Sequence, residues 1–139
     1  LMKVWGFAKT IGELENLDKE TQFILEVAAI THDIACPLCR EKYGNTNGKY
    51  QEIEGDPIVR EFLKDTDLSQ AQIDRVAYLV GHHHTLTDID GLDYQILIEA
   101  DYIVNADESS YSKENITNTC SCVYKTKAGI GILKDIYKL

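Results

Sequence analysis

Residues 24–33 read ILEVAAITHD, and this stretch decides how the chain folds. Its apolar side chains recur every three or four residues, as on the buried face of an amphipathic helix. They are Ile24, Leu25, Ala28 and Ala29. His32 continues this face and Asp33 follows it, while Asp18 stands at the N-cap position and Pro37 ends the pattern. The stretch therefore predicts a core helix that places an imidazole and a carboxylate at its inner end.

Helical spacing extends over most of the remaining sequence, and no segment alternates as a strand would. Ser69 and Gln72 form a capping box that starts one further helix, which runs through His83. The proline, glycines and asparagines of residues 36–49 predict a long loop. Other helices are expected over residues 4–14, 50–64, 93–107, 112–124 and 127–137. The prediction is an all-α fold, one compact domain over residues 1–139 with about six to seven helices.

Composition excludes several classes of protein. The chain has 139 residues and a net charge of −9, which disfavours a nucleic-acid partner because phosphate backbones require a basic surface. A small phosphorylated substrate remains compatible, since a bound metal can supply local positive charge. No apolar run reaches the roughly 20 residues of a membrane helix, and no signal peptide is recognisable. We therefore expect a cytoplasmic protein with no membrane partner; its oligomeric state stays open.

The four cysteines fit this expectation. A chain of this length does not need disulfides to fold, so reduced thiols are the default. They are Cys36, Cys39, Cys120 and Cys122. Zinc binding by these four is the alternative, but no βαβ pattern supports a redox role for the C-x-x-C pair.

Asp101 is the second unusual polar residue. It lies in IEADYIVN (residues 98–105), between Ala100 and Val104 on the apolar face of a long helix. A buried aspartate needs a partner, either a cation or a metal. The chain has three arginines and none is nearby in sequence, so a metal is the simpler partner.

Residues 82–84 are a run of three histidines at the end of a predicted helix. Neighbouring helical residues point about 100° apart, so they cannot all face one way. His83 continues the stripe of Val76 and Val80 and should point inward, with His82 or His84 flanking it. The alternative is a solvated helix end, where histidines meet the helix dipole favourably.

The order of these motifs resembles the HD-domain superfamily of metal-dependent phosphohydrolases. The resemblance covers the whole chain and rests on AAITHDIA, YQEIEG, YLVGHHHT, LIEADYIVN and KTKAGIGIL. It implies that His32, Asp33 and Asp101 hold a divalent metal. The family's first metal-ligand histidine has no counterpart here and is expected immediately before Leu1, unless this member has lost it. Ala35 stands where a glycine often follows the family's dipeptide.

Imidazole and carboxylate ligands suit several divalent metals and do not select among Mn, Fe, Co, Ni and Zn, with Mg also open. Such a metal activates water and polarises a phosphoryl oxygen. Asp33 could ligate the metal and also accept the proton of the attacking water. His82 and His83 could stabilise the developing phosphate charge or hold a second metal.

Several residues are candidates for binding the substrate. Arg40 and Lys42 follow the HD pair, and Asn105 lies one turn beyond Asp101. Glu52 and Glu54 could approach the site from the next helix. Solvated surface positions are the alternative for each of these five side chains.

The sequence thus predicts a metal-dependent phosphohydrolase of a nucleotide or another small phosphorylated metabolite. The rival is a degenerate HD module that senses a nucleotide without catalysis, which the missing first histidine would favour. A dinuclear iron oxygenase on the same scaffold is disfavoured, because its histidines would be spread over more helices.

Overall fold

The structure is a computed structural model and describes residues 2–139. Within this range it contains eight helices and no strand, which confirms the all-α class. The helices are α1 (Met2–Leu14), α2 (Lys19–Thr31), α3 (Cys36–Tyr43), α4 (Gly48–Leu63), α5 (Gln70–His82), α6 (Leu92–Glu108), α7 (Lys113–Cys122) and α8 (Lys127–Tyr137). Because only a turned segment, residues 32–35, separates α2 from α3, the pair can also be counted as one interrupted helix, giving seven.

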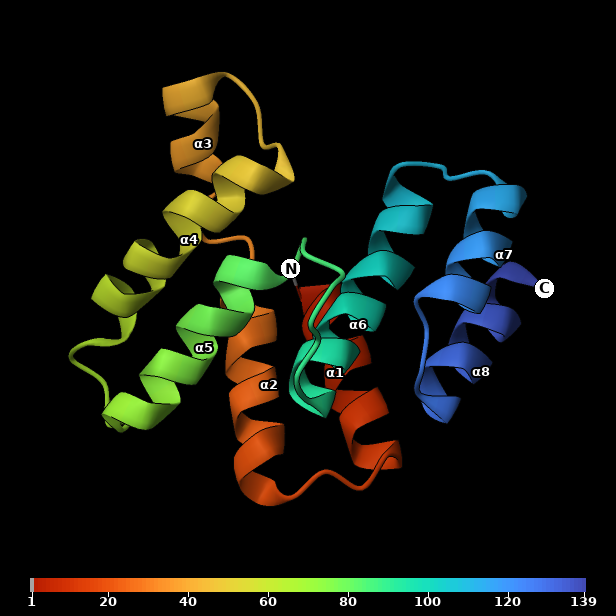
Figure 1. The fold of residues 1–139 in the computed structure, drawn as a ribbon, viewed down its shortest axis with the longest axis horizontal. Coiled ribbons are helices and arrows are strands. Elements are labelled where there is room, and N and C mark those ends of the chain that lie inside the picture. The colour runs from red at the N-terminus through yellow and green to blue at the C-terminus, as the bar shows by residue number, and fades with distance from the viewer. Residues whose placement is uncertain (1) are drawn as a thin grey trace.

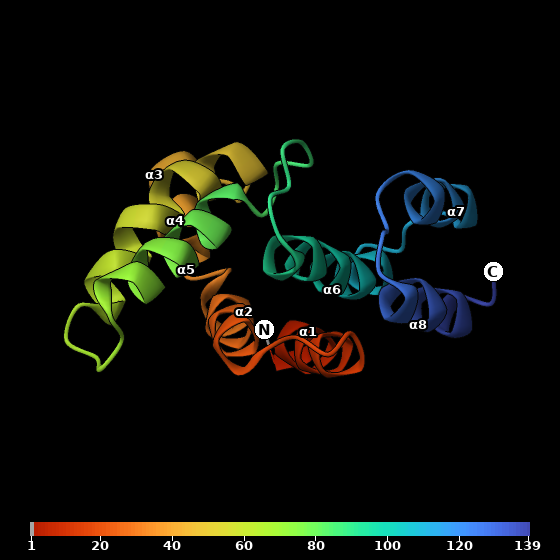
Figure 2. The same cartoon turned by 60° about the horizontal axis from the view of Figure 1, so that its bottom comes forward.

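Helix α6 lies between two groups of helices. On one side α1 and α2 pack against it and against each other, and α2 also contacts α5, which packs on α4 (Figure 1). On the other side α7 and α8 lie together, and α8 contacts α6 (Figure 2). Most of α6 is buried as a result, including the segment from Asp93 to Ala100 and Asp101 itself.

The predicted helix starts are confirmed in detail. The Asp18 carboxylate accepts a hydrogen bond from the Thr21 amide at 2.7 Å, as an N-cap should. Ser69 and Gln72 form both bonds of the predicted capping box at the start of α5.

The predicted loop over residues 36–49 is wrong for its first half, which forms α3. Pro37 lies in the first turn of α3, where its missing N–H costs no hydrogen bond. Gly44, with a left-handed φ of 77°, ends the helix. The preceding helix, α2, ends earlier than predicted, at Thr31. His32 therefore occupies a helix end, and a turn follows it.

By length and hydropathy alone, residues Lys19–Tyr43 would pass as a membrane-spanning helix, with a mean hydropathy of 1.2. The turn at residues 32–35 interrupts this segment, and its apolar residues Leu25, Ala28 and Ala29 belong to the core shared with α1, α5 and α6.

Candidate metal centre

His32 is the C-cap residue of α2 and is almost completely buried, with 1% of its surface exposed. Its Nδ1 donates a hydrogen bond to the carbonyl of Ala29 at 2.7 Å. Nε2 lies 3.1 Å from Oδ2 of Asp33 and 3.2 Å from Oδ1 of Asp101. Neither contact has the direction of a hydrogen bond, so Nε2 has no hydrogen-bond partner. The fold thus brings together two carboxylates around one buried ring nitrogen.

His83 repeats this arrangement at the end of α5. It is the C-cap residue, is 2% exposed, and donates from Nδ1 to the carbonyl of Val80 at 2.7 Å. Its Nε2 is buried and also lacks a hydrogen-bond partner. The rings of His32 and His83 meet edge to face, with their centroids 5.4 Å apart. Both histidines therefore direct Nε2 away from their own helices.

His84 has its orientation set by α4. Gln51 donates from its amide nitrogen to the carbonyl of Thr46 at 2.5 Å, so its amide oxygen faces Nε2 of His84 at 3.0 Å. Nε2 of His84 then carries the proton, and Nδ1 holds the free lone pair. Gly48 lies so close that a Cβ there would be 2.9 Å from Cγ of His84. His83, His84 and Asp101 each offer one ligand atom, all within 4.8 Å of one another.

These residues fit a divalent metal. Buried polar atoms in proteins are almost always partnered, and the Nε2 atoms of His32 and His83 are exceptions that need an explanation. Both rings are held through Nδ1 by a carbonyl, as metal-ligating histidines commonly are. Two carboxylates would balance the charge of the cation. His32, Asp33, His83, His84 and Asp101 could hold such an ion.

Burial and neighbouring charges shift the pKa values of the ionisable groups at the site. Burial alone would lower the pKa of His32, but Asp101 and Asp33 outweigh it and raise that pKa to about 10. Burial alone would raise the pKa of Asp33, but His32 outweighs it and lowers that pKa. Burial, with a contribution from His84, lowers the pKa of His83 to about 4. In the metal-free protein at neutral pH, His32 is therefore in its charged, protonated form, and His83 is neutral.

Hydrogen bonds from two side chains, one on α6 and one on α4, hold the turn that carries His83 and His84. From α6, the buried hydroxyl of Tyr94 lies 3.0 Å from the carbonyl of His82 and 2.6 Å from that of Thr85. From α4, Glu52 accepts from the His84 amide at 3.2 Å and from the Thr85 hydroxyl at 2.8 Å. Of the two glutamates suggested by the sequence, Glu52 thus supports the site through the backbone.

Of the two histidines predicted as alternatives to flank His83, His82 does not join this group. Its ring stacks on Tyr78 with centroids 4.0 Å apart, and its Nδ1 bonds the carbonyl of Tyr78 at 2.8 Å. The ring also lies near Tyr94. The helical rotation of about 100° per residue separates it from His83. The residue that flanks His83 at the site is His84.

Of the three predicted substrate-binding residues, only Asn105 lines the pocket beside the site. Lys42 forms an ion pair with Glu54 at 2.7 Å, so both side chains are engaged with each other. Arg40 is exposed on α3 and does not line the pocket beside the site. Asn105 does line it, together with Asp101. The histidine expected ahead of Leu1 lies outside the described residues and stays a prediction.

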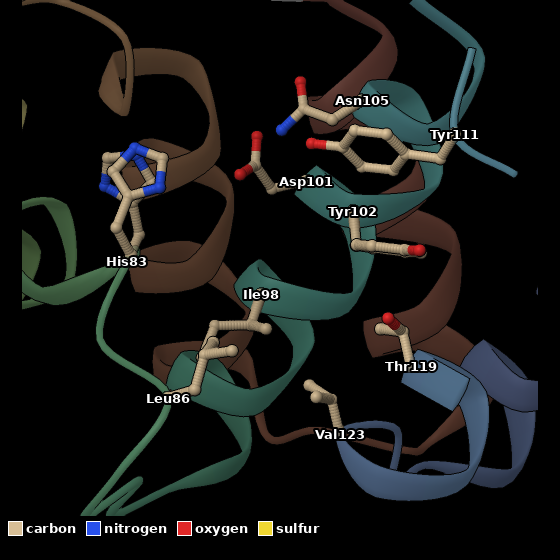
Figure 3. A pocket seen from close by; sticks show the side chains of 10 residues that line it. His83, Leu86, Ile98, Asp101, Tyr102, Asn105, Tyr111, Thr119 and Val123 are labelled. Carbon is tan, nitrogen blue, oxygen red and sulfur yellow. The ribbon is translucent and has the colours of Figure 1, made fainter. Parts of the chain in front are cut away.

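This pocket has a volume of about 200 Å³ and opens beside His83, His84 and Asp101. Residues from α6 and α7, from the segment between them, and from the segments that precede α6 and follow α7 form its other walls (Figure 3). Figure 3 shows the hydroxyl of Tyr111 pointing toward Asp101 and Asn105. No sequence motif indicated Tyr111 or Thr119, because the segment between α6 and α7, and α7 itself, reach this pocket only through the tertiary fold.

Comparison with known proteins supports one assignment. The family model described as HD domain matches residues 1–123. Neither the curated proteins nor the solved structures that were compared gave a match. Members of this family are generally metal-dependent hydrolases, and the His-His-Asp group is compatible with metal binding. The match covers most of the chain, including every helix that contributes to the site, and the chain therefore belongs to the HD domain family.

Proposed function

We propose that the protein is a metal-dependent phosphohydrolase that acts on a small phosphorylated compound. One observation carries the proposal: two buried histidines, His32 and His83, present Nε2 atoms without a hydrogen-bond partner beside Asp101. A purely structural pair of histidines would be expected to bond both ring nitrogens. The adjacent pocket gives a substrate access to Asp101.

The residues of the site have different roles in the proposed reaction. A divalent ion held by His32, Asp33 and Asp101 would lower the pKa of water and polarise the phosphoryl oxygen. Asp33 is the more exposed carboxylate, with 43% of its side chain accessible against 12% for Asp101. Asp33 is therefore placed to accept the proton of the attacking water. His83 and His84 border the pocket, where they can ligate a metal or donate to the substrate phosphate.

The test is metal binding and hydrolysis by the wild type and by Asp101→Ala. A ligand that binds only the folded state must raise the unfolding midpoint, so Mn should raise it in the wild type. Asp101→Ala removes a charged ligand and should abolish both the shift and the hydrolysis of phosphomonoesters. Asp101→Ala also removes a carboxylate that lies 3.2 Å from Nε2 of buried His32, so the metal-free variant should unfold at a lower midpoint than the metal-free wild type.

Glu108→Ala serves as the matched control, because Glu108 lies exposed at the far end of the same helix. It should retain the metal shift and the activity. A wild type that binds Mn, Co or Ni but hydrolyses no phosphorylated compound would instead support a non-catalytic sensor and contradict the proposal.

A further inference from the structure

The pocket beside the candidate metal centre has an unusual charge pattern for a site that would bind phosphates. Among the described residues that line it, none is Lys or Arg. His83, His84 and Asp101 of the centre occupy one wall, and the remaining lining residues are uncharged. Since no cation can neutralise charge away from the centre, a substrate phosphate is accommodated only where a metal would lie.

Two of the chain's three arginines and Lys42 are engaged by carboxylates outside this pocket. Arg75 pairs with Asp90 and Asp93, with its closest contact at 2.7 Å. Arg60 pairs with Asp56 and Asp74. Lys42 is held by Glu54. With a net charge of −9, the molecule as a whole also repels highly charged anions.

The neutral part of the pocket suits a flat, polar group. The rings of Tyr102 and Tyr111 lie with centroids 5.6 Å apart and offer an aromatic wall. Tyr102 is fixed by a hydrogen bond to Asn115 and by the edge of Tyr124. Tyr111 is 39% exposed and forms the outer side. Such rings stack on planar groups of any identity.

Hydrogen-bonding groups accompany these rings. Asn105 lies on the lining and can both donate and accept. Thr119 adds a hydroxyl, while Leu86, Ile98 and Val123 supply apolar surface. At about 200 Å³ the pocket is smaller than the roughly 300–1,000 Å³ typical for drug-sized ligands, which favours a compact substrate.

We infer that the substrate is a phosphomonoester with one phosphate and an uncharged, ring-bearing leaving group, of the kind that a nucleoside provides. This inference rests on the proposed function. The phosphate lies at the metal centre and the ring lies against Tyr102 and Tyr111. Hydrolysis breaks the P–O bond of the ester: water supplies OH to phosphorus, and its proton ends on the leaving oxygen. Substrates with a second phosphate group are disfavoured, because that charge would fall in the neutral part of the pocket.

The first experiment compares adenosine 5′-monophosphate with adenosine 5′-diphosphate and adenosine 3′,5′-bisphosphate, using the full chain with Mn. The monophosphate should be hydrolysed with a kcat/KM at least about tenfold higher, a difference that a single uncompensated charge can produce. Equal or faster hydrolysis of either doubly phosphorylated compound would overturn the inference.

A gain-of-charge variant sharpens the test. Thr119→Lys places a cation on the pocket wall and should narrow the preference for the monophosphate by about fivefold or more. Ser121→Lys adds the same charge at an exposed position on the same helix and should leave the preference unchanged. An equal change in both variants would show a general charge effect and contradict the assignment of the pocket.

Tyr111 tests the leaving-group wall. Tyr111→Leu should raise KM for adenosine 5′-monophosphate while changing kcat/KM for methyl phosphate little, and Tyr111→Phe should restore most of the lost binding. A variant that affects both substrates equally would place Tyr111 outside the leaving-group wall.

Calorimetry separates this inference from the proposed function. If no compound is hydrolysed, the hydrolase proposal fails. The affinities for the two adenosine nucleotides then test the assignment of the pocket separately. Tighter binding of adenosine 5′-monophosphate than of the diphosphate, weakened in Tyr111→Leu, would support the inference. Equal binding of the two, or no binding of either, would overturn it.

Discussion

At the scale of single residues, the site depends on which ring nitrogen of each histidine is anchored. His32 and His83 are both C-cap residues, and each donates from Nδ1 to the carbonyl three residues earlier. The last carbonyls of a helix lack partners within the helix, so the ring satisfies one of them. The same bond fixes the tautomer and leaves Nε2 for a ligand. One local interaction therefore both finishes the helix and prepares the site.

The first residue-scale prediction compares the neighbours His83 and His82. His83→Ala should lower kcat/KM by about 100-fold or more, because it removes a group that lines the pocket. His82→Ala should keep activity within a few fold, since its ring lies against Tyr78. Steady-state kinetics with thermal unfolding measures both effects. The larger loss in His82→Ala would contradict the assignment.

The second residue-scale prediction concerns how the stability of the metal-free protein depends on pH. The carboxylates of Asp101 and Asp33 raise the pKa of His32 from its ordinary value of 6.5 to about 10. A raised pKa means that the charged form is favoured by folding, so this stabilisation is complete below about pH 6.5 and is lost as the pH rises through 10. Urea unfolding between pH 6 and 10 should show this decline in the wild type and a shallower one in His32→Gln. Parallel curves for the two proteins would contradict it.

At the scale of elements, most helices could be predicted from the sequence, because apolar spacing and caps are local signals. Asp18 and Ser69 cap α2 and α5 as expected. Helix α3 was missed, since Pro37 and the glycines of residues 36–49 resemble a loop. Pro37 is compatible with a first helical turn, and Gly44 is a helix end. Composition alone does not distinguish a loop from a short helix bounded by such residues.

The third prediction tests the turn after α5. Tyr94→Phe removes the hydroxyl that bonds the carbonyls of His82 and Thr85. Loss of this buried interaction should lower the free energy of unfolding by about 1–2 kcal/mol. It should also weaken metal binding, because the turn carries His83 and His84. Urea unfolding and metal titration measure the two effects. Tyr78→Phe, which alters a tyrosine that bonds neither carbonyl, is the control and should leave metal affinity unchanged.

At the scale of the whole molecule, α6 connects the site to the C-terminal helices. Glu99 is fully buried two residues before Asp101. Its carboxylate accepts from the amides of Lys125 and Thr126 at 2.9 and 3.1 Å, where α8 begins. Gln95 donates to it as well, at 2.6 Å. A buried carboxylate at a helix N-terminus is favourable when its oxygens are bonded in this way.

The fourth prediction follows from these contacts. Glu99→Ala leaves several buried donors without an acceptor and should lower the free energy of unfolding by about 3 kcal/mol or more. Metal binding by the folded fraction should persist, because Glu99 does not line the pocket. Urea unfolding and metal titration distinguish these effects. A loss of metal affinity without a loss of stability would show that Glu99 belongs to the site.

The sequence by itself determined the helical class, most helix boundaries and the three residues His32, Asp33 and Asp101, which the structure brings together. These features are encoded by local spacing and by the cost of placing polar groups on apolar faces. Only the tertiary structure decided that His84, and not His82, joins His83. It also decided that Gln51, Tyr94, Tyr111 and Thr119 contribute to the site. The physical reason is that these contacts join segments tens of residues apart, and helix packing alone determines which side chains meet.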